Sequence, residues 1–182
     1  GDRLVVFGGE TPEGRADTDV LVLENASGSG GPPEWRRIPV PEGPGRLAWA
    51  SGGYDPVGNR LVLFGGCGGS CGAPSGEAWV LEGADGTAGD PRWRLLSASG
   101  PGPRLGAAAA YDAGRDRLFV FGGASGSGGE DLADLWVLEG AARGAQPSWT
   151  AVAAGGDSPA PRRDAGLAFD AREDRLVLFG GR

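Results

Sequence analysis

Arginines recur in this chain at a constant spacing, in a pattern suited to binding carboxylates. Arg46, Arg104 and Arg162 are each 58 residues from the next, and each stands just before a stretch of small apolar residues. A guanidinium group forms paired hydrogen bonds with a carboxylate, so these side chains are candidates for holding an acidic ligand. They equally suit pairing with acids or backbone carbonyl groups of the same chain, and we favour this second interpretation.

The chain has two cysteines, Cys67 and Cys71, in the sequence Cys-Gly-Gly-Ser-Cys. Three alternatives fit this spacing: a local disulfide, two free thiols, or half of a zinc site completed by another chain. We predict the disulfide, which would fix the shape of a glycine-rich loop but closes too short a loop to stabilise the whole fold much. A disulfide fits an oxidising compartment, so we expect an extracellular or periplasmic protein.

Histidine is absent from the sequence, which removes the commonest general base and metal ligand. Neither a Ser-His-Asp nor a Cys-His arrangement can form, and no Asp-x-Asp-x-Asp-Gly calcium loop occurs. We therefore expect no catalytic residue, no metal site and no cofactor, and we predict that the chain is not an enzyme.

The charge balance is acidic, with a net charge of −7. Binding to nucleic acid needs a positive face that releases counterions from phosphates, so nucleic acid is not an expected partner. No window of 18 consecutive apolar residues occurs, so we expect no membrane-spanning helix and no membrane partner.

One block of eight residues recurs four times and organises the whole chain. The four copies are DRLVVFGG at 2–9, NRLVLFGG at 59–66, DRLFVFGG at 116–123 and DRLVLFGG at 174–181. Tryptophans recur near the same interval, at positions 35, 93 and 149. A fixed period of fifty-odd residues indicates a repeat architecture, in which each unit is one small supersecondary structure.

Each repeat is read as four short strands. The first is small and apolar, as in 105–111, and a turn at 112–115 leads into the second, an apolar run such as 118–121 that ends in Gly-Gly. The third strand covers 19–24, 77–82 and 134–139, and the fourth begins at the recurring tryptophan. No segment has a helical period with caps, so the sequence predicts an all-β protein.

Four-stranded units of this length stack face to face around an axis, as the blades of a β-propeller. The residues resemble the kelch repeat, with its apolar run ending in Gly-Gly, an aromatic residue in the next strand, a tryptophan in the fourth strand and an arginine before the next unit. In kelch propellers the corresponding arginines often line the channel mouth, and some hold acidic peptide groups, which the resemblance implies for Arg46, Arg104 and Arg162. Trp49 lies outside the tryptophan register, in a strand of small residues, so we expect it to face the channel and to stack on a ligand.

The repeat boundaries predict one kelch-repeat array over residues 1–182. It would comprise a partial blade at 1–45, complete blades at 46–102 and 103–161, and a partial blade at 162–182. A three-blade arc cannot close a propeller, which typically has four to eight blades. We expect either a second copy, giving a six-bladed homodimer, or the missing blades of a longer chain to complete it.

The sequence favours a non-catalytic scaffold that binds a protein or peptide. Loops at 10–18, 67–76 and 124–133 differ far more than the strands, as expected of a binding surface on a rigid frame. Two alternatives stay open: a carbohydrate-binding propeller, and an excised or engineered propeller fragment without a ligand. We expect the tryptophans at 35, 93 and 149 to pack between blades.

Overall fold

The chain folds into short antiparallel strands. The computed structural model describes residues 2–11, 18–68, 71–87, 89–96, 99–126 and 128–182, which contain thirteen strands and no helix. The prediction of an all-β protein is therefore confirmed. Over these same ranges, no helix is long and apolar enough to cross a membrane.

Within the described residues, the strands form four sheets in which neighbouring strands follow one another in the sequence. The first sheet contains β1 (Arg3–Phe7), β2 (Val20–Glu24) and β3 (Glu34–Ile38). The second contains β4 (Ser51–Asp55), β5 (Arg60–Phe64), β6 (Ala78–Glu82) and β7 (Arg92–Leu96). The third contains β8 (Ala108–Asp112), β9 (Arg117–Phe121), β10 (Leu135–Glu139) and β11 (Ser148–Val152), and the fourth contains β12 (Ala165–Asp170) and β13 (Arg175–Gly180).

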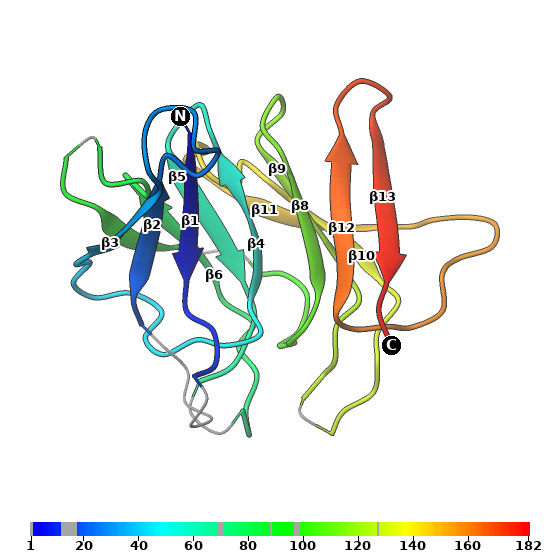
Figure 1. Ribbon diagram of the computed structural model, residues 1–182. Coiled ribbons are helices and arrows are strands. Elements are labelled where there is room, and N and C mark those ends of the chain that lie inside the picture. Colours follow the sequence, from blue (N-terminus) through cyan, green and yellow to red (C-terminus); the bar gives the residue numbers. More distant parts are fainter. Residues whose placement is uncertain (1, 12–17, 69–70, 88, 97–98, 127) are drawn as a thin grey trace.

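The sheets follow one another in an arc, from the blue first sheet to the red fourth sheet in Figure 1. Strand β4 packs against β8, and β8 packs against β12, so the first strands of successive repeats lie together. These strands are rich in glycine and alanine, which lets neighbouring sheets approach closely there. A Cβ added at Gly53 would lie only 2.4 Å from the Cβ of Tyr111 in the next sheet.

An apolar core fills the space between neighbouring sheets. Val62, Phe64 and Val80 of the second sheet share one buried cluster with Leu118 and Leu138 of the third. The strand that carries the Gly-Gly block, such as β9, is central in its sheet, and both of its faces are covered. Its continuous apolar sequence follows from that position, since an outward-facing side would have required polar residues.

An aromatic pair marks each complete joint between sheets. The ring centroids of Phe7 and Trp93 lie 4.7 Å apart, and those of Phe64 and Trp149 lie 4.9 Å apart. In both pairs the phenylalanine ends the second strand of one repeat and the tryptophan lies in the fourth strand of the next. The expectation that the recurring tryptophans pack between blades holds for Trp93 and Trp149, whereas Trp35, in the first sheet of the described chain, is 53% exposed.

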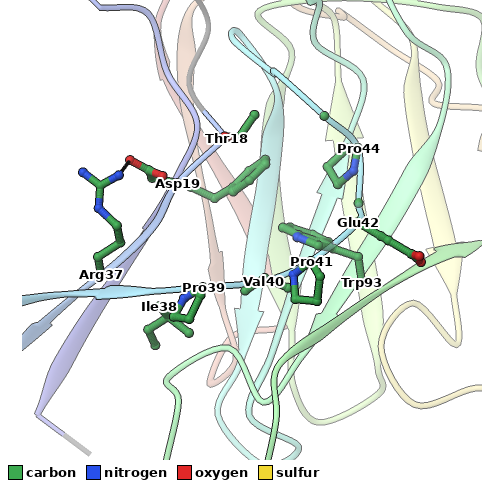
Figure 2. Close-up of a pocket in the computed structure, with 13 residues that line it drawn as sticks. Thr18, Asp19, Arg37, Ile38, Pro39, Val40, Pro41, Glu42, Pro44 and Trp93 are labelled. Atoms are coloured by element: carbon green, nitrogen blue, oxygen red, sulfur yellow. Dashed lines mark ion pairs between the residues drawn. The ribbon is translucent and has the colours of Figure 1, made fainter.

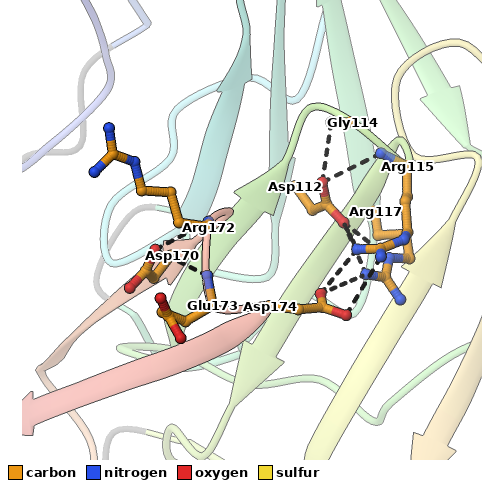
Figure 3. A network of polar contacts seen from close by, with 8 residues as sticks. All are labelled: Asp112, Gly114, Arg115, Arg117, Asp170, Arg172, Glu173 and Asp174. Carbon is orange, nitrogen blue, oxygen red and sulfur yellow. Dashed lines mark hydrogen bonds and ion pairs between the residues drawn. The ribbon is translucent and has the colours of Figure 1, made fainter.

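Arginines and aspartates form ion pairs at the end of the sheets where a turn joins the first and second strands of each repeat (Figure 3). Asp112 is buried; it accepts a hydrogen bond from the Gly114 amide and pairs with Arg117 at 2.7 Å. Burial raises the pKa of Asp112, but the hydrogen bonds from Arg117 and the turn amides outweigh it, and the net pKa is lowered. Arg115 bridges to Asp174 in the fourth sheet at 2.8 Å, so this end of the molecule ties neighbouring sheets together.

The contribution of the phenylalanine in the joint to the free energy of unfolding should depend on whether a neighbouring sheet buries it. Phe64→Ala should lower the free energy of unfolding by about 3–5 kcal/mol, because Phe64 is 1% exposed and the cavity would open against Trp149. Phe179 occupies the same repeat position but is 84% exposed, so Phe179→Ala is the matched control and should change stability little. Chemical denaturation of both variants measures the difference, and similar losses would contradict this account of the joint.

Candidate functional site

The candidate site lies at the end of the arc where the Gly-Gly blocks and the connections between repeats meet, at the bottom of Figure 1. Backbone hydrogen bonds join one sheet to the next there. The amide of Gly66 donates to the Arg104 carbonyl at 2.9 Å, and the amide of Gly123 donates to the Arg162 carbonyl at 2.9 Å. The Gly9 amide makes the same bond to the Leu47 carbonyl at 3.0 Å. The glycines therefore fix how the connections between repeats are placed along the rim.

These hydrogen bonds correct the alignment of the three predicted arginines. They place Leu47, and not Arg46, in register with Arg104 and Arg162. Leu47 is 6% exposed, whereas Arg46 is exposed and lines a separate small cavity with Glu77 and Trp79. In the connection leading to the second sheet, the arginine therefore stands one residue before the position that the arginine occupies in the other two connections. The constant interval of 58 residues between the three arginines hides this difference.

Arg104 is held entirely by groups of its own chain. It is 3% exposed, donates to the carbonyls of Gly102 and Gly122, and forms a bidentate pair with Asp134 at 2.6 and 3.0 Å. Burial raises the pKa of Asp134, but the hydrogen bonds from Arg104 and from the Trp136 indole outweigh it and lower the net pKa. This geometry matches the interpretation that the arginine pairs within the chain.

The Arg162 guanidinium makes the same backbone hydrogen bonds as Arg104, without the carboxylate that Asp134 provides to Arg104. It donates to the carbonyls of Ala160 and Gly180, both at 3.0 Å, just as Arg104 donates to Gly102 and Gly122. The acid in this arrangement stands directly before the third strand of the repeat, and in the described chain the fourth sheet consists of β12 and β13. Arg162 is consequently only half-buried, whereas Arg104 is buried. Ligand binding by Arg46, Arg104 or Arg162 stays a prediction.

Trp49 has an unusual backbone for a bulky residue. Its φ is +57°, and it stands in register with Gly106 (φ +62°) and Asp164 (φ +59°). The Gly106 amide donates to the Trp49 carbonyl at 2.9 Å, and the Asp164 amide donates to the Gly106 carbonyl at 2.8 Å. Glycine tolerates this left-handed conformation, whereas a tryptophan in it is strained. The hydrogen bonds across the arc hold Trp49 in place with its side chain 45% exposed.

Trp49 lines a cavity of about 180 Å³, which we call the Trp49 mouth. Its other lining residues are Cys71, Leu105, Arg163, Asp164 and Arg182. The predicted disulfide between Cys67 and Cys71 is present, and it brings Cys71 to this cavity.

Sequence reasoning missed both arginines of the Trp49 mouth. Arg163 pairs with Asp131 at 2.8 Å, and Arg182 donates to Asp164 at 3.0 Å. Arg163 directly follows Arg162, but its register partners are Ala48 and Leu105, so no repeated arginine revealed it. Arg182 reaches the mouth because its backbone pairs with that of Arg163.

The size and lining of the Trp49 mouth limit its chemistry. Pockets for drug-sized ligands usually span about 300–1,000 Å³, so this cavity suits a single side chain of a larger partner. An exposed indole beside two guanidinium groups is suited to an aromatic, aliphatic or acidic side chain. No group of three or more His, Cys, Asp or Glu side chains in the described ranges could hold a metal ion.

Comparison with known proteins agrees with this architecture. The family model described as the KLHDC2/KLHL20/DRC7 Kelch-repeats domain matches residues 56–182. The chain belongs to the kelch-repeat family. Among solved structures, the kelch-repeat chain is similar to that of YjhT with a TM-score of 0.72 and 14% identity, over 99% of this chain and 56% of that one. At this identity the likeness shows the fold alone.

Curated relatives of this kelch-repeat chain are much longer proteins. Adagio-like protein 3 and putative adagio-like protein 2, both from Oryza sativa subsp. japonica, are each 32% identical to it over its whole length. The chain spans 26% of each of these relatives, about a quarter of their length.

Removing the Arg104 guanidinium should destabilise the kelch-repeat chain. Arg104→Gln should lower the free energy of unfolding by about 2 kcal/mol at pH 7, because a buried carbonyl and Asp134 lose a charged donor. Arg46→Gln changes an exposed arginine outside this register and should have little effect.

The difference between these two variants should shrink in acid. The folded pKa of Asp134 is lowered, so its contribution is complete above its unfolded pKa of about 3.9 and is lost as the pH falls through the folded value. Chemical denaturation at pH 7 and at lower pH measures this, and equal stability of the two variants at pH 7 would contradict the role of Arg104.

Proposed function

We propose that this kelch-repeat chain forms part of a non-catalytic scaffold that binds a protein or peptide at the Trp49 mouth. Kelch-type propellers are commonly interaction scaffolds, and the strained Trp49 is the observation that carries the proposal. An exposed tryptophan held at φ +57°, where the next repeat has glycine, adds strain without burying its ring. Contact of the indole with a partner would offset this backbone strain, because tryptophan is enriched among the residues that dominate binding energy.

The two ends of the sheets differ in a way that supports this choice of face. At the hairpin end, arginines are engaged with acids across the joints, as in the pairs Arg115–Asp174 and Arg143–Asp55 (2.8 and 3.5 Å). At the opposite end, Arg163 and Arg182 also pair with acids, Asp131 and Asp164, but there they line a cavity together with an exposed indole. We propose that the hairpin end joins the sheets and the Trp49 mouth binds the partner.

A non-catalytic role is supported by the chemistry of the Trp49 mouth. Its arginines pair with carboxylates, its cysteine is in a disulfide, and the sequence provides no histidine to activate a nucleophile.

Carbohydrate binding is the second candidate, because Trp49 and the Asp164 carboxylate line the same cavity. A sugar site combines an aromatic platform with polar groups that fix the orientation of hydroxyls. Binding of the chain to a glycan array, together with the absence of selected peptides, would favour this alternative. A propeller fragment without a ligand would bind in neither assay.

The open arc has to be completed for a closed propeller to form. We propose that either a second copy or further blades of a longer chain completes it, and the exposed apolar residues Leu4, Trp35 and Phe179 at the two ends of the arc support this.

The test of peptide binding uses Trp49→Gly, which installs the residue found in register at position 106. Peptides selected by display on the intact chain should bind the variant at least tenfold more weakly, because the indole is lost. Stability should stay the same or rise, since the strain at positive φ is relieved. Val57→Ser, at a 73% exposed residue of the opposite end, is the control and should leave binding unchanged. Undiminished binding by Trp49→Gly would contradict the proposed site.

The oxidising compartment is supported by the Cys67–Cys71 disulfide and can be tested on protein isolated from its source. Under denaturing conditions without reductant, iodoacetamide should add nothing to either cysteine, and after reduction it should label both. Because the bridge closes so short a loop, reduction should leave the unfolding midpoint almost unchanged. Labelling before reduction would contradict an extracellular or periplasmic location.

A further inference from the structure

Both complete joints between sheets use the same arrangement, a tryptophan inserted between a phenylalanine and a glycine. Trp93 packs edge-on against Phe7, and a Cβ added at Gly43 would lie 2.3 Å from its Cδ1 atom. Figure 2 shows the connection 39–44 passing along the Trp93 indole. In the next joint Trp149 packs on Phe64, and a Cβ at Gly100 would lie 2.2 Å from its Cδ1 atom.

The third joint has the socket but no tryptophan. Phe121 stands where Phe7 and Phe64 stand in the earlier joints, and it lines a cavity of about 520 Å³ with Val152, Leu178 and the connection 157–159. The fourth strand of a repeat supplies the tryptophan, and the fourth sheet consists of β12 and β13 in the described chain. We call this cavity the Phe121 socket.

The first sheet displays the matching tryptophan. Trp35 occupies the same position in β3 as Trp93 in β7, and it is 53% exposed. In the described chain the first sheet consists of β1, β2 and β3, and a cavity of about 470 Å³ lined by Leu4, Val5 and Tyr54 lies beside the free edge of β1. The two ends of the described arc are thus complementary: the fourth sheet consists of a first and a second strand, and the first sheet consists of a second, a third and a fourth strand.

We propose that a second copy of this chain docks head to tail, so that Trp35 of one copy enters the Phe121 socket of the other. In this arrangement β12 of one copy is the first strand of a composite blade whose remaining strands are those of the other copy's first sheet. This inference rests on the proposed completion of the open arc and selects a second copy as the occupant. One composite blade completes both ends of the arc at once, and this favours a second copy over an unrelated partner.

Charges at the composite blade are complementary. Arg162 is posed like Arg104 but lacks the acid that Asp134 provides. Asp19 of the incoming first sheet stands where Asp134 stands in the third sheet, directly before the third strand of its repeat. It pairs with Arg37 in the single chain (Figure 2), and in the composite blade it also meets Arg162.

The composite blade needs only one second strand, although each copy brings one. Strands β13 and β1 share the sequence Arg-Leu-Val and an apolar continuation, and each pairs at present with a neighbour in its own chain. The arginine at the start of either strand faces an acid of the first strand, as Arg175 faces Asp170 in β12.

Ser158 provides a direct test, because it stands four residues before Arg162, where Gly43 and Gly100 precede Leu47 and Arg104. A Cβ at the two glycines would overlap the tryptophan, so the Ser158 Cβ hinders Trp35 in the socket. Ser158→Gly should therefore tighten association several-fold, and Trp35→Ser should weaken it at least tenfold. Leu95→Ser changes an exposed apolar residue in the outer strand of the second sheet, away from the socket, so it is the control and should leave association unchanged.

Sedimentation equilibrium over a hundredfold concentration range measures association of the intact chain and these variants. The proposal predicts masses rising from 18.4 kDa to multiples of that value. A wild-type mass of 18.4 kDa at all concentrations would overturn it and would leave blades of a longer chain as the occupant.

A cross-link distinguishes this interface from other modes of self-association. The double variant Trp35→Cys, Ser158→Cys should form an intermolecular disulfide between positions 35 and 158, identified by mass spectrometry of the linked peptides. Association without this cross-link, and without sensitivity to Trp35→Ser, would overturn the head-to-tail arrangement while leaving completion by a second copy intact. Peptide binding at the Trp49 mouth is measured separately and should be unaffected by Trp35→Ser.

Discussion

The structure depends on burying both faces of small sheets that cannot do so alone. A four-stranded sheet of five-residue strands has little interior of its own, so its apolar side chains are covered only by the next sheet. The contact between a phenylalanine of one repeat and a tryptophan of the next lies at the centre of this packing. Because the same joint is built twice along the chain, each sheet is held by its neighbours.

This dependence on neighbours explains the ends of the arc. Residues at one repeat position are buried or exposed according to whether a neighbouring sheet is present, as in Phe64 (1% exposed) and Phe179 (84% exposed). Arg104 and Arg162 differ in a similar way: Arg104 is buried and pairs with Asp134, whereas Arg162 is half-buried beside a sheet that consists of β12 and β13 in the described chain. The exposed apolar surface is therefore a property of an open arc, and completing the propeller would cover it.

The rim combines rigidity with a surface that differs between repeats. Glycine amides of one sheet donate to carbonyls of the connection that leads into the next, and these bonds fix the backbone around Trp49, Gly106 and Asp164. Side chains at these positions differ although their backbones correspond. Only the repeat with tryptophan offers a large apolar surface there, and this concentrates the capacity for binding at the Trp49 mouth.

The sequence by itself determined the strands, their order and the kelch resemblance. These features rest on local patterns: apolar runs, paired glycines, and Asp or Asn at turns such as the one before β9. The disulfide was also predictable, because only three residues lie between its cysteines.

Tertiary structure decided which residues meet at the rim. The alignment of Leu47 with Arg104, and the convergence of Arg163 and Arg182 on the Trp49 mouth, follow from hydrogen bonds between segments distant in the sequence. A constant interval locates repeats only to within a residue, whereas one residue at a connection changes which side chain is buried and which is exposed. For that reason the repeated blocks predicted the sheets, and only the packing of one sheet on the next defined the site.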